Sequence, residues 1–98
     1  MIINEILQKL QTAQNPVAKA IHKGDHFKVL AIGFKKGMQL KAHKTNLAAK
    51  LTVLSGQVIY IQGNLNKKLS QFDETAIPVG VIHEVACTED ALCLLTQG

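Results

Sequence analysis

The sequence predicts an all-β domain, a barrel or a sandwich, preceded by a short amphipathic helix. After Pro16 the chain divides into short runs rich in Val, Ile and Leu, and turn residues separate these runs at nearly even spacing. The 98 residues, of which 47% are apolar, suffice for one hydrophobic core and are too few for two. A single domain over residues 1–98 follows from these observations.

Residues 1–14 are expected to form the helix. Asn4 is a suitable cap for its start, and Pro16 lies shortly beyond its end. A helical stripe of this kind usually docks on the core of its own domain, so we expect it to pack against a barrel over residues 17–97. The apolar residues at helical spacing are Ile3, Ile6, Leu7 and Leu10.

The rest of the chain has the pattern of strands joined by turns. Gly56 lies between two apolar runs, where a hairpin needs positive φ at little cost. Residues 88–90 are expected to connect the last two strands. The expected strands cover residues 17–23, 27–35, 39–45, 49–55, 57–61, 65–69, 74–77, 83–87 and 91–96.

Composition argues against several classes of partner. The net charge of +4 comes from scattered lysines, and the absence of Arg counts against sequence-specific nucleic-acid binding. No apolar run is long enough to span a bilayer, and the N-terminus lacks a signal-peptide pattern. We therefore expect a cytoplasmic protein with no membrane partner. Aromatic residues make up only 4% of the chain, which disfavours a pocket built on stacking.

Two motifs occur in order within this strand pattern. In the first, Gly37 is followed after five residues by His43, then by the polar Thr45, and the segment closes on Gly56. This spacing resembles the first motif of the cupin superfamily.

The second motif contains a proline, a glycine and a histidine. Pro78, Gly80 and His83 resemble the second cupin motif, and Asp73 precedes them where the family often has an acid. The resemblance covers roughly residues 27–96. It implies a cupin double-stranded β-helix, which is a jelly-roll barrel, and a homodimer.

Metal-binding cupins hold their metal with three histidines and a glutamate, and the resemblance implies which residues stand at those positions. The first and last histidines correspond to His43 and His83, while the second histidine is replaced by Thr45 and the glutamate by Ala49. An asparagine common in the second motif is replaced by Cys87. About half of the usual ligands are therefore missing.

Strand periodicity predicts which side chains share the pocket. Alternate residues face the same side, so Lys41 should point inward together with His43 and Thr45, and Cys87 together with His83. No carboxylate joins them, because counting one residue past Ala49 reaches only Lys50. The expected ligand-binding residues are Lys41, His43, Thr45, His83 and Cys87.

A tight iron or manganese site is not expected, because two neutral imidazoles do not offset the charge of a divalent ion. Two alternatives stay open for His43 and His83: a weak site for zinc, nickel or copper that Cys87 could complete as a thiolate, or no metal at all. His22 and His26 are expected to be exposed and without a role.

Three functions are compatible with this pocket. The first is a barrel that binds a small anionic molecule against Lys41, His43 and His83 without a metal. The second is a small metal-dependent enzyme, like the dioxygenases or isomerases among cupins, with a degenerate site at the two histidines. The third is a regulatory module that acts through a partner chain. The sequence identifies no ligand and does not decide whether the protein is a catalyst.

Overall fold

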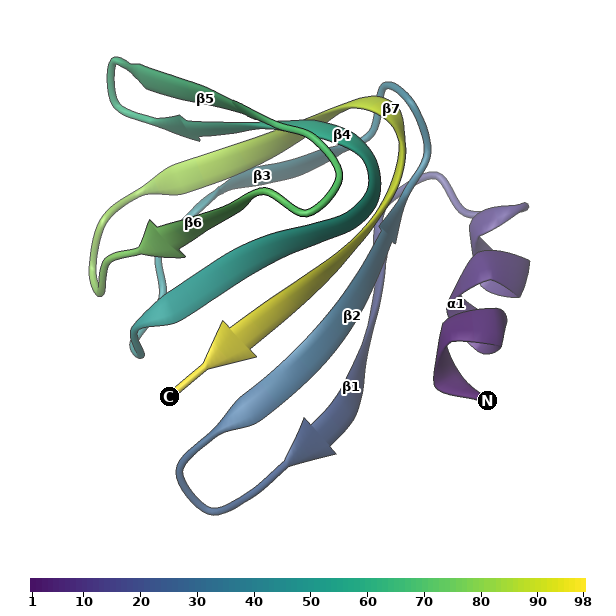
Figure 1. Cartoon of the computed structure of the whole chain (residues 1–98), viewed down its shortest axis with the longest axis horizontal. Helices are drawn as coiled ribbons and strands as arrows, with labels where there is room; N and C mark the ends of the chain where they lie inside the picture. The colour runs from purple at the N-terminus through teal and green to yellow at the C-terminus, as the bar shows by residue number, and fades with distance from the viewer.

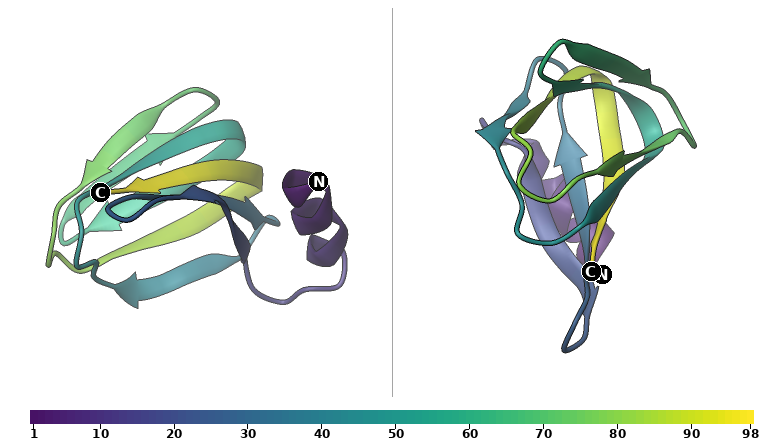
Figure 2. Two further views of the ribbon diagram at one scale, coloured as in Figure 1. Left: turned by 90° about the horizontal axis from the view of Figure 1, so that it is seen from below. Right: turned by 90° about the vertical axis from the view of Figure 1, so that its left-hand side faces the viewer.

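One helix and seven strands make up the structure, a computed structural model that describes residues 1–98 (Figure 1). They are α1 (Ile2–Leu10), β1 (Val17–Lys23), β2 (Lys28–Phe34), β3 (Gln39–His43), β4 (Ala49–Gln62), β5 (Leu65–Leu69), β6 (Glu74–Ile77) and β7 (His83–Gln97). Neighbouring strands follow the order β1-β2-β7-β4-β5, with β3 added to β7 and β6 added to β4. All of these pairs are antiparallel, and the strands enclose one core (Figure 2).

The two long strands, β4 and β7, bend so that each belongs to both faces of the barrel. The first half of β4 pairs with β6 and the end of β7, and its second half pairs with β5 and the start of β7. The sequence predicted each as two strands, with a hairpin at Gly56 and a connection at residues 88–90. Gly56 has a positive φ of 82°, but it lies at the bend inside β4, and residues 88–90 lie inside β7.

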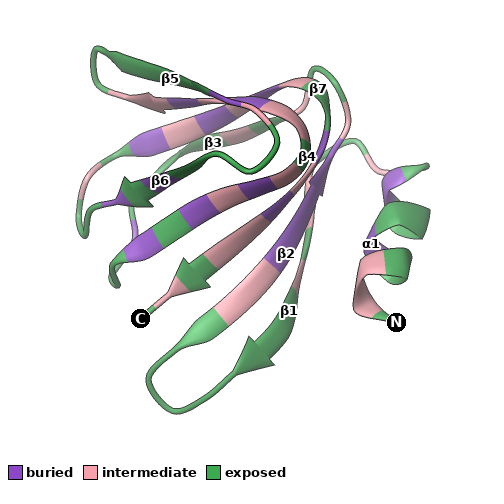
Figure 3. Ribbon diagram, viewed as in Figure 1, coloured by how far each residue is buried: buried purple, intermediate pink, exposed green.

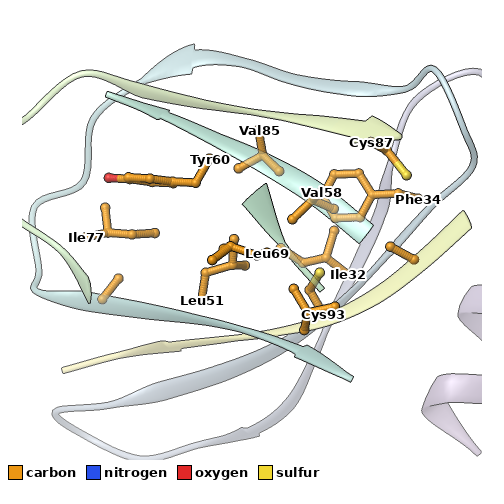
Figure 4. Close-up of a cluster of buried hydrophobic side chains, with 13 residues drawn as sticks. Ile32, Phe34, Leu51, Val58, Tyr60, Leu69, Ile77, Val85, Cys87 and Cys93 are labelled. Atoms are coloured by element: carbon orange, nitrogen blue, oxygen red, sulfur yellow. The ribbon is translucent and has the colours of Figure 1, made fainter. Parts of the chain in front are cut away.

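Alternation along the strands places the core between the two faces. In β4, Ala49, Leu51 and Val53 are buried while the residues between them are more exposed, as the period of two predicts (Figure 3). The buried side chains form one aliphatic cluster with Tyr60 and Phe34 as its largest members (Figure 4).

Helix α1 packs outside the barrel against β1 and β2. Its buried residues Ile6 and Leu10 lie over Gly33, where a Cβ would approach Ile6 Cγ2 to 2.7 Å. The predicted docking face is therefore observed, but the helix ends at Leu10 and not at residue 14. Asn4 lies inside the helix, because Met1 occupies the N-cap position without a side-chain hydrogen bond. This nine-residue helix is too short to cross a membrane.

One end of the barrel, called here the open end, gathers the segments that carry the two cupin-like motifs. At this end β3 stops at His43, β7 starts at His83, and the last pair of β7 joins Gln97 to Ala49. The loops of residues 24–27, 44–48 and 78–82 surround it (Figure 1, left and bottom).

Candidate functional site

His43 and His83 lie side by side at the open end. They are cross-strand partners in the β3–β7 pairing, and their ring centroids are 4.3 Å apart with the planes tilted by 56°. His83 is only 3% exposed, whereas His43 is exposed. The sequence placed both residues in one pocket on the basis of two separate motifs, and the structure brings them into contact.

Backbone hydrogen bonds orient both rings in the same way. His43 Nδ1 lies 2.7 Å from the carbonyl oxygen of Lys41, and His83 Nδ1 lies 3.1 Å from that of Val81. A carbonyl oxygen only accepts, so each Nδ1 carries the proton and each Nε2 remains free. No fully buried polar side-chain atom lacks a partner, and therefore Nε2 of the buried His83 still reaches solvent. Two free imidazole nitrogens thus lie at the same end of the barrel.

Tyr60 extends this pair into a row of three rings. Its ring is fully buried, stacks on His83 at a centroid distance of 5.8 Å, and its hydroxyl donates to Gln62 Oε1 at 2.7 Å. Burial raises the pKa of the Tyr60 hydroxyl, which stays protonated as a donor. Composition had disfavoured stacking, and Tyr60 was not among the expected site residues. The sequence did contain a signal for Tyr60. It lies two residues after Val58 in an alternating strand, so the two side chains face the same side, and both are buried.

The structure does not bring Lys41 to the histidines. A β-bulge separates Leu40, which pairs with Val85, from His43, which pairs with His83. Leu40 packs on the core and His43 contacts His83, so these two residues, three apart in the sequence, both face the inside of the barrel. Lys41 lies between them and is exposed. The expected alternation fails here because the bulge adds one residue between the two inward positions.

A different lysine is on the inner side of the barrel. Lys67 in β5 is the direct partner of the buried Tyr60, and its Nζ donates to Thr75 Oγ1 at 3.1 Å. Thr75 is 4% exposed and belongs to β6, so the ammonium bridges the gap between β5 and β6. The sequence analysis did not single out Lys67, and the residue as a whole is exposed although its strand position faces inward.

Thr45 is buried beside His43 but its polar atoms are already paired. Its hydroxyl donates to the carbonyl oxygen of Leu47 at 2.6 Å, and its own carbonyl accepts from the Gly80 amide at 3.0 Å. Thr45 therefore holds the loops 44–48 and 78–82 together, and its hydroxyl proton is already donated within the protein.

Cys87 lies at the other end of the core from the histidine pair. Cys87 follows His83 by four residues in an extended strand, which separates their Cα atoms by roughly 13 Å. Figure 4 shows Cys87 beside Phe34 and away from the Tyr60 hydroxyl. Its thiol donates to the carbonyl oxygen of Glu89 at 2.8 Å. The soft three-ligand site with His43 and His83 is therefore not assembled.

The remaining donor set does not fit a tightly held divalent metal. Ala49 is buried and apolar, while Lys50 points outward and forms a 3.6 Å ion pair with Glu74. No group of three or more His, Cys, Asp or Glu side chains converges anywhere in the protein. Two imidazoles without an anionic ligand are left, which is fewer than the three protein ligands that catalytic zinc sites use.

The second cysteine, Cys93, gives a testable pH dependence. Burial raises the pKa of its thiol to about 12 from 9.0, with a smaller contribution from Cys87. The unfolded thiol ionises first, so stability is fully present below about pH 9 and falls as the pH rises toward 12, by about 1.4 kcal/mol per unit. Urea unfolding under reducing conditions at pH 8, 9 and 10 measures the free energy of unfolding. Between these pH values it should decline less for Cys93→Ala than for the natural protein. Equal declines in both proteins would contradict this expectation.

A cleft of about 290 Å³ opens beside His43. Residues 43–47 form one wall, and Leu95 and Gln97 at the end of β7 form the other. No acidic side chain lines it. His22 and His26 lie outside this region and are exposed, as expected, with the His22 ring tilted against Phe27 at 5.3 Å.

Comparison with known proteins adds to this description. No protein-family model and no curated protein matches the chain, whereas many solved structures do. An RmlC-like cupin from Desulfovibrio desulfuricans is 24% identical, with a TM-score of 0.80 over 87% of this chain and 83% of that one. A cupin superfamily protein from Desulfitobacterium hafniense is 17% identical, with a TM-score of 0.80 over 94% of this chain and 86% of that one.

A conserved protein with a double-stranded β-helix domain from Klebsiella pneumoniae is 19% identical, with a TM-score of 0.79. The alignment covers 89% of this chain and 79% of that one. These likenesses agree with the topology in which β4 and β7 run through both faces of the barrel. The chain is therefore a small cupin-fold domain, a double-stranded β-helix preceded by one short helix.

Proposed function

We propose that this protein is a small-molecule-binding barrel whose ligand contacts the free Nε2 atoms of His43 and His83. One observation carries the proposal. Both Nδ1 atoms are held by backbone carbonyls, so both rings are fixed and present an unpaired nitrogen at the open end. Rings held by their own backbone need little ordering when a ligand arrives, which lowers the entropic cost of binding.

The charges at the open end favour an anionic ligand. Lys44 lines the cleft beside His43, no acid does, and the chain as a whole carries +4. An anion binds the doubly protonated form of each ring, in which Nε2 also carries a proton. This N–H and an ammonium both donate charge-assisted hydrogen bonds, which are about twice as strong as neutral ones. We propose Lys44, rather than Lys41, which does not line the cleft, as the cationic partner of the two histidines.

This binding function does not require a metal. A metal-dependent enzyme would need a third protein ligand near His43 and His83, and no further His, Cys, Asp or Glu side chain converges with them. We therefore favour binding without metal-assisted chemistry. We separately propose that the protein acts in the cytoplasm.

We also propose that the barrel forms a homodimer. Leu54, Leu92 and Leu94 are half-buried and lie on the outward parity of β4 and β7, close to one another across the strand pair. An apolar strip of this kind on the outside of a sheet is suited to a second copy of the chain. Light scattering during size exclusion should give twice the chain mass of 10.7 kDa, and the monomer mass would contradict the proposal.

A substitution at the exposed His43, compared with a substitution of a histidine outside the cleft, tests the anion site. We expect acetate, phosphate or pyruvate to perturb the imidazole NMR signals of His43 and His83 in a saturable titration. His43→Ala should raise Kd about tenfold, because a hydrogen bond to a charged group is lost. The control, His22→Ala, removes an exposed histidine of β1 that does not line the cleft and should leave Kd unchanged. If no anion shifts either signal, or if both variants behave alike, the proposed site is refuted.

A further inference from the structure

Four large apolar side chains are exposed on the loops around the open end. They belong to three segments that are separate in sequence: the β1–β2 turn, the β3–β4 loop and the β6–β7 loop. Exposed apolar residues on several neighbouring loops often mark a binding surface. This apolar rim consists of Phe27 (44% exposed), Leu47 (49%), Val79 (55%) and Ile82 (61%).

Backbone hydrogen bonds hold the rim loops against one another. The Gly80 amide donates to the Thr45 carbonyl at 3.0 Å, which joins the loop bearing Val79 and Ile82 to the loop bearing Leu47. The Gly98 amide donates to the Ala48 carbonyl, also at 3.0 Å, and Gly98 lies against Phe27. The loops that carry the rim are therefore held close to one another.

Two clefts extend beneath this rim and share Gln97. The first, of about 290 Å³, begins at His43 and includes Leu47 and Leu95. The second, of about 380 Å³, lies on the other side of the β3–β4 loop and includes Phe27 and Ala48. A chain that starts at His43 could follow apolar side chains from one cleft toward the other.

Positive charge is concentrated where this path begins. Lys44 lies next to His43 in the first cleft, which contains no Asp or Glu side chain. Lys50 lines the second cleft, but its ammonium forms an ion pair with Glu74. A third hollow, which shares Phe27 and Leu47 with these clefts, contains Asp25 together with Lys23 and Lys28. The open end thus combines a cationic side chain beside His43 with exposed apolar side chains on the surrounding loops.

We propose that the ligand is an amphipathic anion, a carboxylate that carries an unbranched apolar chain. The carboxylate binds at His43 and Lys44, and the chain lies along Leu47 and Leu95. This inference rests on the proposed anion-binding function and specifies the class of ligand that the site accepts. A small polar anion would use the donors and leave the apolar rim uncovered.

A chain-length series tests the proposal. The ligands are acetate, butyrate, hexanoate and octanoate below their micelle concentrations, with 1-hexanol and 1-octanol as neutral controls, measured by NMR titration. Burial of each methylene should lower Kd about two- to fourfold until the clefts are filled. The alcohols should bind at least about tenfold more weakly than acids of the same length.

Variants separate the two parts of the site. Leu47→Ser should remove much of the dependence on chain length and leave acetate unchanged, whereas Lys44→Gln should weaken all acids by a similar factor. The matched control is Phe72→Ser, because Phe72 is 75% exposed on the β5–β6 turn, away from the open end. It should not change any of these Kd values.

The possible failures are distinguishable. If acetate and octanoate bind equally well, the amphipathic inference is overturned and the anion site stands. If no acid binds at any length, the proposed function falls as well. If alcohols bind as tightly as acids, the headgroup assignment to His43 and Lys44 is refuted. Binding to phosphatidylcholine vesicles without saturable binding of monomeric octanoate would overturn the proposal and identify the rim as a lipid-docking surface.

Discussion

Gly56→Ala should destabilise this protein by about 3 to 5 kcal/mol, enough to remove much of the stability of a domain of this size. Gly56 has a φ of 82°, a region that costs a residue with a Cβ about 1 to 2 kcal/mol. A Cβ would also lie 2.7 Å from both Ala91 Cα and the Asp90 carbonyl carbon. These are backbone atoms of β7, so neither can rotate away as a side chain could.

Gly63→Ala is the matched control for this substitution. Gly63 has a φ of 58°, but nothing lies within 4 Å of the position that its Cβ would occupy. Alanine there should cost only about 1 kcal/mol, the backbone strain alone. Urea unfolding of the three proteins measures the difference. Equal losses for the two variants would mean that β4 and β7 do not approach closely at Gly56.

The double substitution Thr45→His with Ala49→Glu should create a divalent metal site that the natural chain lacks. His43 and His83 already supply two oriented nitrogens, and the new side chains would supply a third imidazole and an anionic ligand. Ala49 is buried with its Cβ on the inner side of β4, so a glutamate there enters the barrel. Affinity for zinc or nickel should rise on the order of 100-fold.

Thermal unfolding with and without metal measures this gain and accounts for the cost of the substitution. The carboxylate introduced by Ala49→Glu is expected to destabilise the metal-free protein, because a buried charge without a partner is unfavourable. Added zinc should then raise the melting temperature of the double variant and leave the natural protein nearly unchanged. His83→Ala in the double variant should abolish the effect. If zinc stabilises neither protein, the four positions do not converge in the barrel.

Most strands were predictable because their signals are local. The alternation Ala49, Leu51, Val53 indicates a strand with one buried face whatever its partner is, and β1, β5 and β6 have the predicted bounds. The helix end and the cap at Asn4 were predicted less well. A helix boundary depends on a few weak capping interactions, whereas its docking face depends on several buried side chains.

The inward side of β3 could not be predicted from alternation. A bulge between Leu40 and His43 adds a residue opposite β7, and it moves Lys41 out of the pocket that the period of two assigned to it. Whether a strand bulges depends on its pairing with a partner that lies far away in the chain, here β7. The same limit hid Lys67, whose inward position follows from its pairing with Tyr60.

The residues alone predicted most of the alternating segments, a positive φ at Gly56, and the absence of a carboxylate at positions 49 and 50, although the hairpin expected at Gly56 is a bend inside β4. These properties depend on residue identity and on local periodicity. The three-dimensional arrangement was needed to find the stacking of Tyr60 on His83, the separation of Cys87 from the histidines, and the exposed apolar residues that three separate loops bring to the open end. Each of these depends on the register between strands and on the way β4 and β7 bend together, which no local pattern encodes.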